Sequence, residues 1–315
     1  MPRPPNSLLW ALLLASTIPT AVPVILVAGF DFTVQPAWIM AGMGFLGMAH
    51  TGSTGFFYTE EHDRRRMIWV PLGFIALAAA VFALDPAGFW PYLAVHYIWL
   101  MWHLGRQNFG LYALVAGGAS EAERFFFDLL AEAAMPAMLT LYIPDALAPD
   151  AAAFLRVLSL LLMAYAVLLF ICLTVGYYRE AVAAGRTRSV VSQGAECNGG
   201  AEIQTVASCR YWSRPTALFL GLAFWLPTVI STNPAVALTW FAHPFQYLIM
   251  VAWVSGRRGW VELAVAAGYA LGLWALLTGL YSAGALLAFS ALTYGASQAH
   301  FLIDGEVWRR GRAVV

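Results

Sequence analysis

The sequence contains no lysine and few charged residues of any kind. Only 11% of its 315 residues are charged, whereas a soluble domain usually carries about 25%. All 17 basic residues are arginine and the formal net charge is zero, so no basic stripe indicates a nucleic-acid partner. Hydrophobic residues make up 61% of the chain, and several apolar runs reach the roughly 20 residues that a membrane-crossing helix needs. The composition predicts a polytopic α-helical membrane protein.

Motifs of several enzyme classes are also absent. The sequence has no GxSxG nucleophile elbow, no DxxxD pair for a prenyl diphosphate, and none of the HxxxH and HxxHH clusters of membrane desaturases and hydroxylases. It has only three cysteines, and the spacing of Cys197 and Cys209 fits no CxxC zinc motif. These absences argue against nucleophilic hydrolysis, prenyl transfer and a cysteine-based zinc site.

Hydropathy divides the chain into ten expected membrane spans. They are residues 8–30, 37–57, 67–84, 88–115, 125–144, 151–177, 215–231, 235–255, 260–279 and 283–304. Arginines such as Arg64 and Arg124 fall in alternate loops, and the opposite loops hold aspartates but no arginine. By the positive-inside rule, both termini are then cytoplasmic. The first apolar run is longer than a signal-peptide core, so we expect an uncleaved helix there.

We therefore expect one transmembrane domain over residues 1–315, an all-α bundle of about ten helices in the cell membrane, of bacterial inner-membrane type. The one long connection, residues 179–214, is rich in Gly, Ser and Ala, which is typical of a flexible linker. It is expected to be a cytoplasmic loop, where Cys197 and Cys209 stay reduced.

Five of the six histidines fall inside expected spans, where an ionisable residue is costly to bury and is therefore a functional candidate. At a helical rise of about 1.5 Å per residue, His103 and His243 lie ~18 Å from the cytoplasmic ends of their helices. His50 and His300 lie ~10 Å and ~6 Å from theirs. His96 precedes His103 by two turns on nearly the same helix face. Four helices thus direct a histidine toward the middle or the cytoplasmic half of the membrane.

Acidic and amide residues accompany these histidines. Asp304 lies one turn after His300, and Asp128 and Glu132 lie about two turns inside the fifth span. Metal-bound histidines usually need a partner for the second ring N–H. The candidates for that role are Gln107, Gln246, Tyr247 and Asp128.

Neutral imidazoles with one or two carboxylates suit non-haem iron and also accept copper or zinc. The ligand candidates are His50, His96, His103, His243 and His300, and the candidates for a catalytic role are Glu132, Asp304 and Arg106. Each histidine has an alternative role as a hydrogen-bonding residue between helices. His96 is either a ligand or a residue of the substrate channel, and Arg106 either balances a nearby carboxylate or takes part in the chemistry. A redox metal inside a membrane indicates O2 and a lipophilic substrate.

The segment HFLID, which begins at His300, resembles the His-apolar-Leu-Ile-Asp segment of the Brp/Blh-type bacterial β-carotene dioxygenases. AHTGST around His50 is similar to that family's early His-Gly motif, and His96 or His103 matches its next histidine. Those proteins are all-helical membrane enzymes in which intramembrane histidines are thought to hold a non-haem iron that cleaves β-carotene to retinal. The resemblance implies that His50, His103, His243 and His300 are iron ligands. The chain departs from the pattern because the early motif lacks its following Asp and His243 lacks a paired histidine.

Two other classes of function use the same residues. In a haem electron carrier, His103 with His243 and His50 with His300 would each clamp a haem axially. Against this, no helix here carries the two widely spaced histidines that are usual in b-type cytochromes. In a transporter, Glu132, Asp304 and the histidines would form a path for protons or metal ions.

Overall fold

A computed structural model of the chain describes residues 61–84, 89–116, 118–143, 147–194, 201–233 and 291–302, together with isolated residues between 11 and 26, 243 and 249, and 264 and 275. The five long helices are α3 (Glu61–Leu84), α4 (Phe89–Ala116), α5 (Glu121–Tyr142), α6 (Pro149–Gly194) and α7 (Ala201–Ile230). Residues 291–302 form one further helical segment. The described residues contain no strand, so the all-α prediction is confirmed for this part of the chain.

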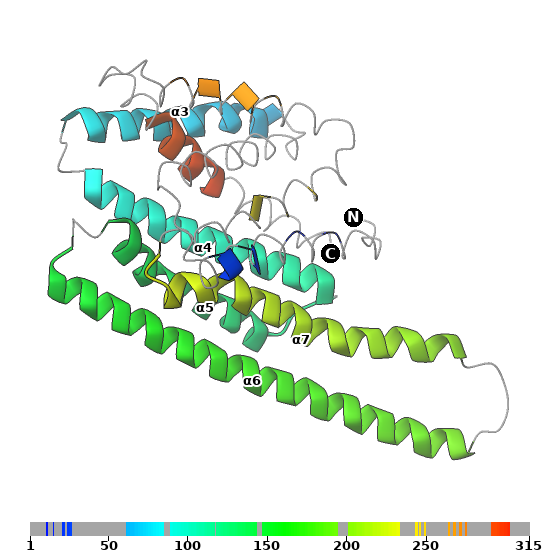
Figure 1. Cartoon of the computed structure of the whole chain (residues 1–315). Coiled ribbons are helices and arrows are strands. Elements are labelled where there is room, and N and C mark those ends of the chain that lie inside the picture. Colours follow the sequence, from blue (N-terminus) through cyan, green and yellow to red (C-terminus); the bar gives the residue numbers. More distant parts are fainter. Residues whose placement is uncertain are drawn as a thin grey trace.

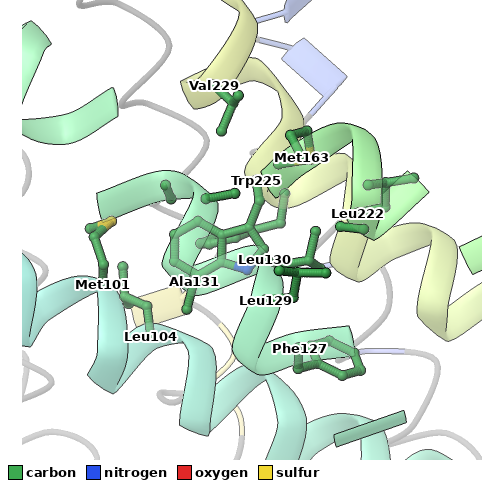
Figure 2. Packing of buried hydrophobic residues seen from close by; sticks show 14 of the residues in the cluster. Met101, Leu104, Phe127, Leu129, Leu130, Ala131, Met163, Leu222, Trp225 and Val229 are labelled. Atoms are coloured by element: carbon green, nitrogen blue, oxygen red, sulfur yellow. The ribbon is translucent and has the colours of Figure 1, made fainter. Parts of the chain in front are cut away.

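Helices α4, α5, α6 and α7 pack together, with α6 and α7 antiparallel and extending past the others (Figure 1). Their shared core is centred on Trp225, which lies among Leu130, Ala131, Met163 and Val229 (Figure 2). The buried positions of α5 include several alanines: Ala131, Ala133, Ala134 and Ala137. Small residues let helix backbones approach closely, which is the usual basis of helix association in membranes.

A second packing contact joins residues 291–302 to α3, as Figure 1 shows. Gly295 lies so close to α3 that a Cβ atom added to it would be 2.5 Å from the Ile75 Cα atom. The Tyr92 hydroxyl of α4 donates a hydrogen bond to Gln298 Oε1 at 2.8 Å. These contacts fix the segment that carries His300 against α3 and α4.

A buried carboxylate ties four elements together at the start of α5. Glu123 is 0% exposed and forms a capping box with Ser120, whose backbone N–H donates to Glu123 Oε2 at 2.5 Å. The Tyr112 hydroxyl of α4 donates to Glu123 Oε1, as does the Tyr177 hydroxyl of α6 at 2.5 Å. Arg214 of α7 donates from Nη1 to the same oxygen at 3.0 Å. One carboxylate thus holds helices α4, α6 and α7 to the start of α5.

The expected loop at 179–214 differs from the structure. Helix α6 continues to Gly194 and α7 begins at Ala201, so both expected span ends lie inside longer helices. Alanine, glutamate and arginine, all good helix formers, follow the expected span end at residue 177 and favour continuation of α6. The connection 195–200 contains the adjacent Gly199 and Gly200. At about 1.5 Å per residue, the 46 residues of α6 extend roughly 70 Å, about twice the hydrocarbon thickness of a bilayer.

One described helix, the Pro149–Ala183 part of α6, is long and apolar enough to cross a membrane. The expected spans 88–115 and 125–144 coincide closely with α4 and α5, and the span 67–84 falls within α3. Residues 8–30, 37–57, 235–255 and 260–279 lie wholly or mostly outside the described residues. The count of ten spans therefore stays a prediction.

We expect Gly295→Ala to destabilise the protein because the new methyl group would collide with the backbone of α3. Overpacking of this kind costs about 1–3 kcal/mol, which should lower the midpoint of thermal unfolding in detergent. Gly73→Ala in α3 is the matched control, since its added Cβ meets nothing within 4 Å. The control should leave the midpoint unchanged or raise it, and equal destabilisation by both variants would contradict the close approach.

Glu123→Gln should destabilise the protein by about 2 kcal/mol, because it leaves the Arg214 guanidinium without its carboxylate partner. Glu121→Gln, at an exposed position of the same first turn, should change the free energy of unfolding by less than about 0.5 kcal/mol. A double-mutant cycle with Arg214→Gln measures the coupling. Additive effects of the two single substitutions would show that the pair does not hold the helices together.

Candidate metal centre

Helix α4 buries polar residues, while several of its large apolar residues are exposed. His96, His103 and Gln107 follow one another at intervals of seven and four residues and are 3–6% exposed. The apolar Val95 and Ile98, in contrast, are 57% and 42% exposed. A soluble amphipathic helix, in contrast, buries an apolar stripe and turns its polar residues to solvent.

Three histidines from separate parts of the chain meet beside α4. The ring of His103 lies 5.0 Å from that of His300 and 5.6 Å from that of His243, measured between ring centroids. All three are buried, with 3–6% of each residue exposed. We call His103, His243 and His300 the histidine cluster. The structure brings together residues that are up to 197 positions apart. Similar depths were expected for His103 and His243, whereas His300 was expected nearer the cytoplasmic end of its helix.

The tightest polar contact in the cluster is local to α4. Gln107, one turn after His103, places its Nε2 atom 3.1 Å from His103 Nε2. In this arrangement the amide N–H donates and the ring nitrogen accepts. Phe301 covers the other side of His103, with ring centroids 4.6 Å apart and planes tilted by 32°. An amide and an aromatic ring thus restrict the orientation of the imidazole.

His96 lies outside the cluster. Its ring contacts are with Tyr97 at 5.7 Å, Tyr294 at 4.8 Å and Phe301 at 5.7 Å between centroids. Phe301 contacts both His96 and His103, so its ring lies between the two histidines. Tertiary structure therefore separates two residues that share a helix face.

The charged candidates of α4 and α5 form a separate, more exposed group. Arg106 Nε lies 3.5 Å from Asp128 Oδ1, and both side chains are 29% exposed. Arg124 also approaches Asp128, at 3.8 Å, and the Arg106 guanidinium lies over the Trp102 ring. This geometry matches the charge-balancing interpretation of Arg106. Glu132 is exposed on α5.

Gln246 is buried in the same described segment as His243. The remaining candidates, His50, Tyr247 and Asp304, lie outside the described residues.

The ion pair of the buried Glu123 with Arg214 was not among the sequence candidates. A signal for Glu123 is present in the sequence, because Ser120 followed three residues later by Glu123 is a capping-box pattern. The pattern predicts the start of a helix, however, and carries no information on the tyrosines and the arginine that reach the same carboxylate from other helices.

The residue types and ring spacings of the histidine cluster fit a metal, but the positions of its nitrogen atoms do not form a metal site. Two imidazole nitrogens bound to one metal at about 2.1 Å hold their ring centres about 5 Å apart, close to the spacings in the histidine cluster. Within the described part of the chain, however, no three His, Cys, Asp or Glu side chains hold their donor atoms in a metal-binding arrangement. Rotation about the soft final torsion of each imidazole reorients its nitrogens while the helices stay in place. The fit is therefore one of residue type and ring spacing.

Comparisons with known protein families, curated proteins and solved structures find no match for this chain.

Proposed function

We propose that the chain is a multi-pass membrane oxygenase that binds non-haem iron through the histidine cluster and acts on a lipophilic polyene with O2. The observation that carries the proposal is the convergence of His103, His243 and His300 inside an apolar helix bundle. His50, outside the described residues, is the candidate for a fourth ligand. When bound, iron would supply the redox chemistry that activates O2.

The exterior of α6 supports a membrane environment. Large apolar residues recur along its exposed face every three or four positions, among them Phe154, Leu161, Leu168 and Val175. Only 17% of its most apolar window is buried inside the protein, whereas the core helix of a soluble fold is mostly buried. Monomeric soluble proteins rarely expose apolar surface of this extent, whereas a bilayer covers it.

The residues around the cluster favour a bound apolar chain over an aqueous path. Phe301 and Tyr294 contact the histidines, and Trp99 lies 6.0 Å from Phe301 between ring centroids. Concave sites for apolar ligands are lined mainly by such aromatic side chains, with a few placed polar groups. In this proposal the aromatic rings position the polyene and exclude water, and Gln107 orients the His103 imidazole.

The two other functions receive less support from the geometry. Two separate haems would divide the histidines into pairs, yet His300 lies nearer to His103 than His243 does. A proton path through Glu132 and the histidines is disfavoured because Glu132 is exposed on α5. One shared site is the simpler explanation of the cluster.

We expect His103→Ala to abolish retention of iron, since it removes the central ring of the cluster. The measurement is elemental metal content per chain in the detergent-purified protein, after anaerobic loading with iron. His62→Ala, at the start of α3, is the control and should retain the metal. Wild-type protein that takes up no iron, copper or zinc would refute the proposed metal centre, and a strong Soret band would favour haem.

Iron-loaded wild-type protein should consume a conjugated polyene with O2 and release carbonyl products. The test follows the loss of visible absorbance of β-carotene and detects aldehydes by mass spectrometry, with His103→Ala as the inactive control. Iron retention without any turnover of polyenes would leave the metal centre in place and refute the proposed substrate class.

Gln107→Leu should retain the volume of the side chain but remove the hydrogen bond to His103. Loss of an outer partner of a metal-bound histidine typically weakens metal affinity by about 10–100-fold. A His103 ring that binds metal through Nδ1 carries its proton on Nε2, so the Gln107 amide would then turn to accept through its oxygen. Metal competition with a chelator measures this affinity, and Gln107→Glu, which retains an oxygen acceptor, should recover part of it. An unchanged affinity in the leucine variant would show that Gln107 has no positioning role.

A further inference from the structure

His96 is a buried histidine, and one of its ring nitrogens has no hydrogen-bond partner in the described part of the chain. The residue is 6% exposed, and this nitrogen is Nδ1. A buried polar atom without a partner costs about 1–3 kcal/mol, so native proteins retain few of them. A nitrogen of this kind at the side of a candidate substrate site calls for a ligand atom as its partner.

The surroundings of His96 define which ligand would reach it. Its ring is enclosed by Tyr97, Tyr294 and Phe301, all aromatic, and Phe82 and Tyr92 extend this aromatic lining next to Tyr294. The nearby Tyr92 hydroxyl already donates to Gln298. A purely apolar ligand would pack against the aromatic rings but would leave the imidazole nitrogen without a hydrogen bond. A ligand that is apolar along its length and has an oxygen at its end would pack against the rings and also hydrogen-bond to the nitrogen.

The distance between His96 and His103 fits such a ligand. Seven residues of helix separate them by about 10 Å along α4, on nearly the same face. Phe301 contacts both histidines, so a ligand chain that reaches from one to the other would lie against its ring. An oxygen held at His96 would place a conjugated bond several carbon atoms away beside the histidine cluster.

We propose that His96 binds the oxygen-bearing end of a long conjugated substrate, whose chain runs along α4 past Phe301 to His103. The preferred substrate is then a polyene with a hydroxyl or keto group on its end ring, rather than a pure hydrocarbon. This inference rests on the proposed function and specifies the substrate class of that site. His96 is accordingly a residue of substrate specificity and not a metal ligand.

The test compares two carotenoids with one carbon skeleton, zeaxanthin with hydroxyl groups and β-carotene without them. Their affinities for the iron-loaded, detergent-purified full chain are measured by quenching of tryptophan fluorescence. His96→Phe should lower the ratio of zeaxanthin to β-carotene affinity by about 3–10-fold, the effect of one lost hydrogen bond. His96→Gln, which can still hydrogen-bond, should retain most of the ratio. Partitioning of the two carotenoids into micelles is the same for every variant, so it cancels when the affinity ratio of a variant is compared with that of the wild type.

Ile98→Ala, at an exposed position of α4, is the control and should leave the ratio unchanged. A ratio that His96→Phe does not alter overturns the inference while the oxygenase proposal stands. Loss of iron from His96→Phe also overturns it, because His96 would then be a metal ligand. If wild-type protein retains iron but binds neither carotenoid, the inference and the proposed substrate class both fail.

Discussion

The pairing of Glu123 with Arg214 is the interaction on which the arrangement of the helices depends. A carboxylate inside an apolar bundle is costly unless it is paired and hydrogen-bonded, and Glu123 has partners from α4, α6 and α7 as well as its own cap. These partners are compatible with one relative position of the helices. The packing around Trp225 joins the same helices that these polar contacts hold together.

The same principle applies to the histidines, with a different outcome. Nearly every polar group on the inner face of α4 is buried among apolar residues, so each requires a partner that the protein or a ligand supplies. His103 has Gln107 and two other imidazoles beside it, which is a donor set suited to a metal. His96 has aromatic rings around it, a setting suited to an organic ligand. Two histidines two turns apart on one helix thus have different surroundings, because different side chains of other segments reach them.

Periodicity and hydropathy predicted the helices well where apolar residues dominate a run of helical length. The span 88–115 coincides with α4, because most of its residues are apolar and the capping signal of the next helix follows at Ser120. The expectation of a flexible loop at 179–214 differs from the structure, because composition alone does not distinguish a polar linker from an exposed helix that continues beyond the membrane. The ion pair of Arg214 with Glu123 likewise could not be predicted from the sequence, because it depends on which helices become neighbours.

By itself, the sequence determined the helical class, the apolar exterior and the set of candidate histidines, because residue composition and spacing are local properties. Only the tertiary structure decided that His103 lies with His243 and His300, that His96 lies apart from them behind Phe301, and that Arg106 pairs with Asp128. The physical reason is that helix periodicity sets the face on which a side chain lies but not the helix that covers that face. The choice of neighbour follows from close packing of small residues and from the pairing of buried polar groups.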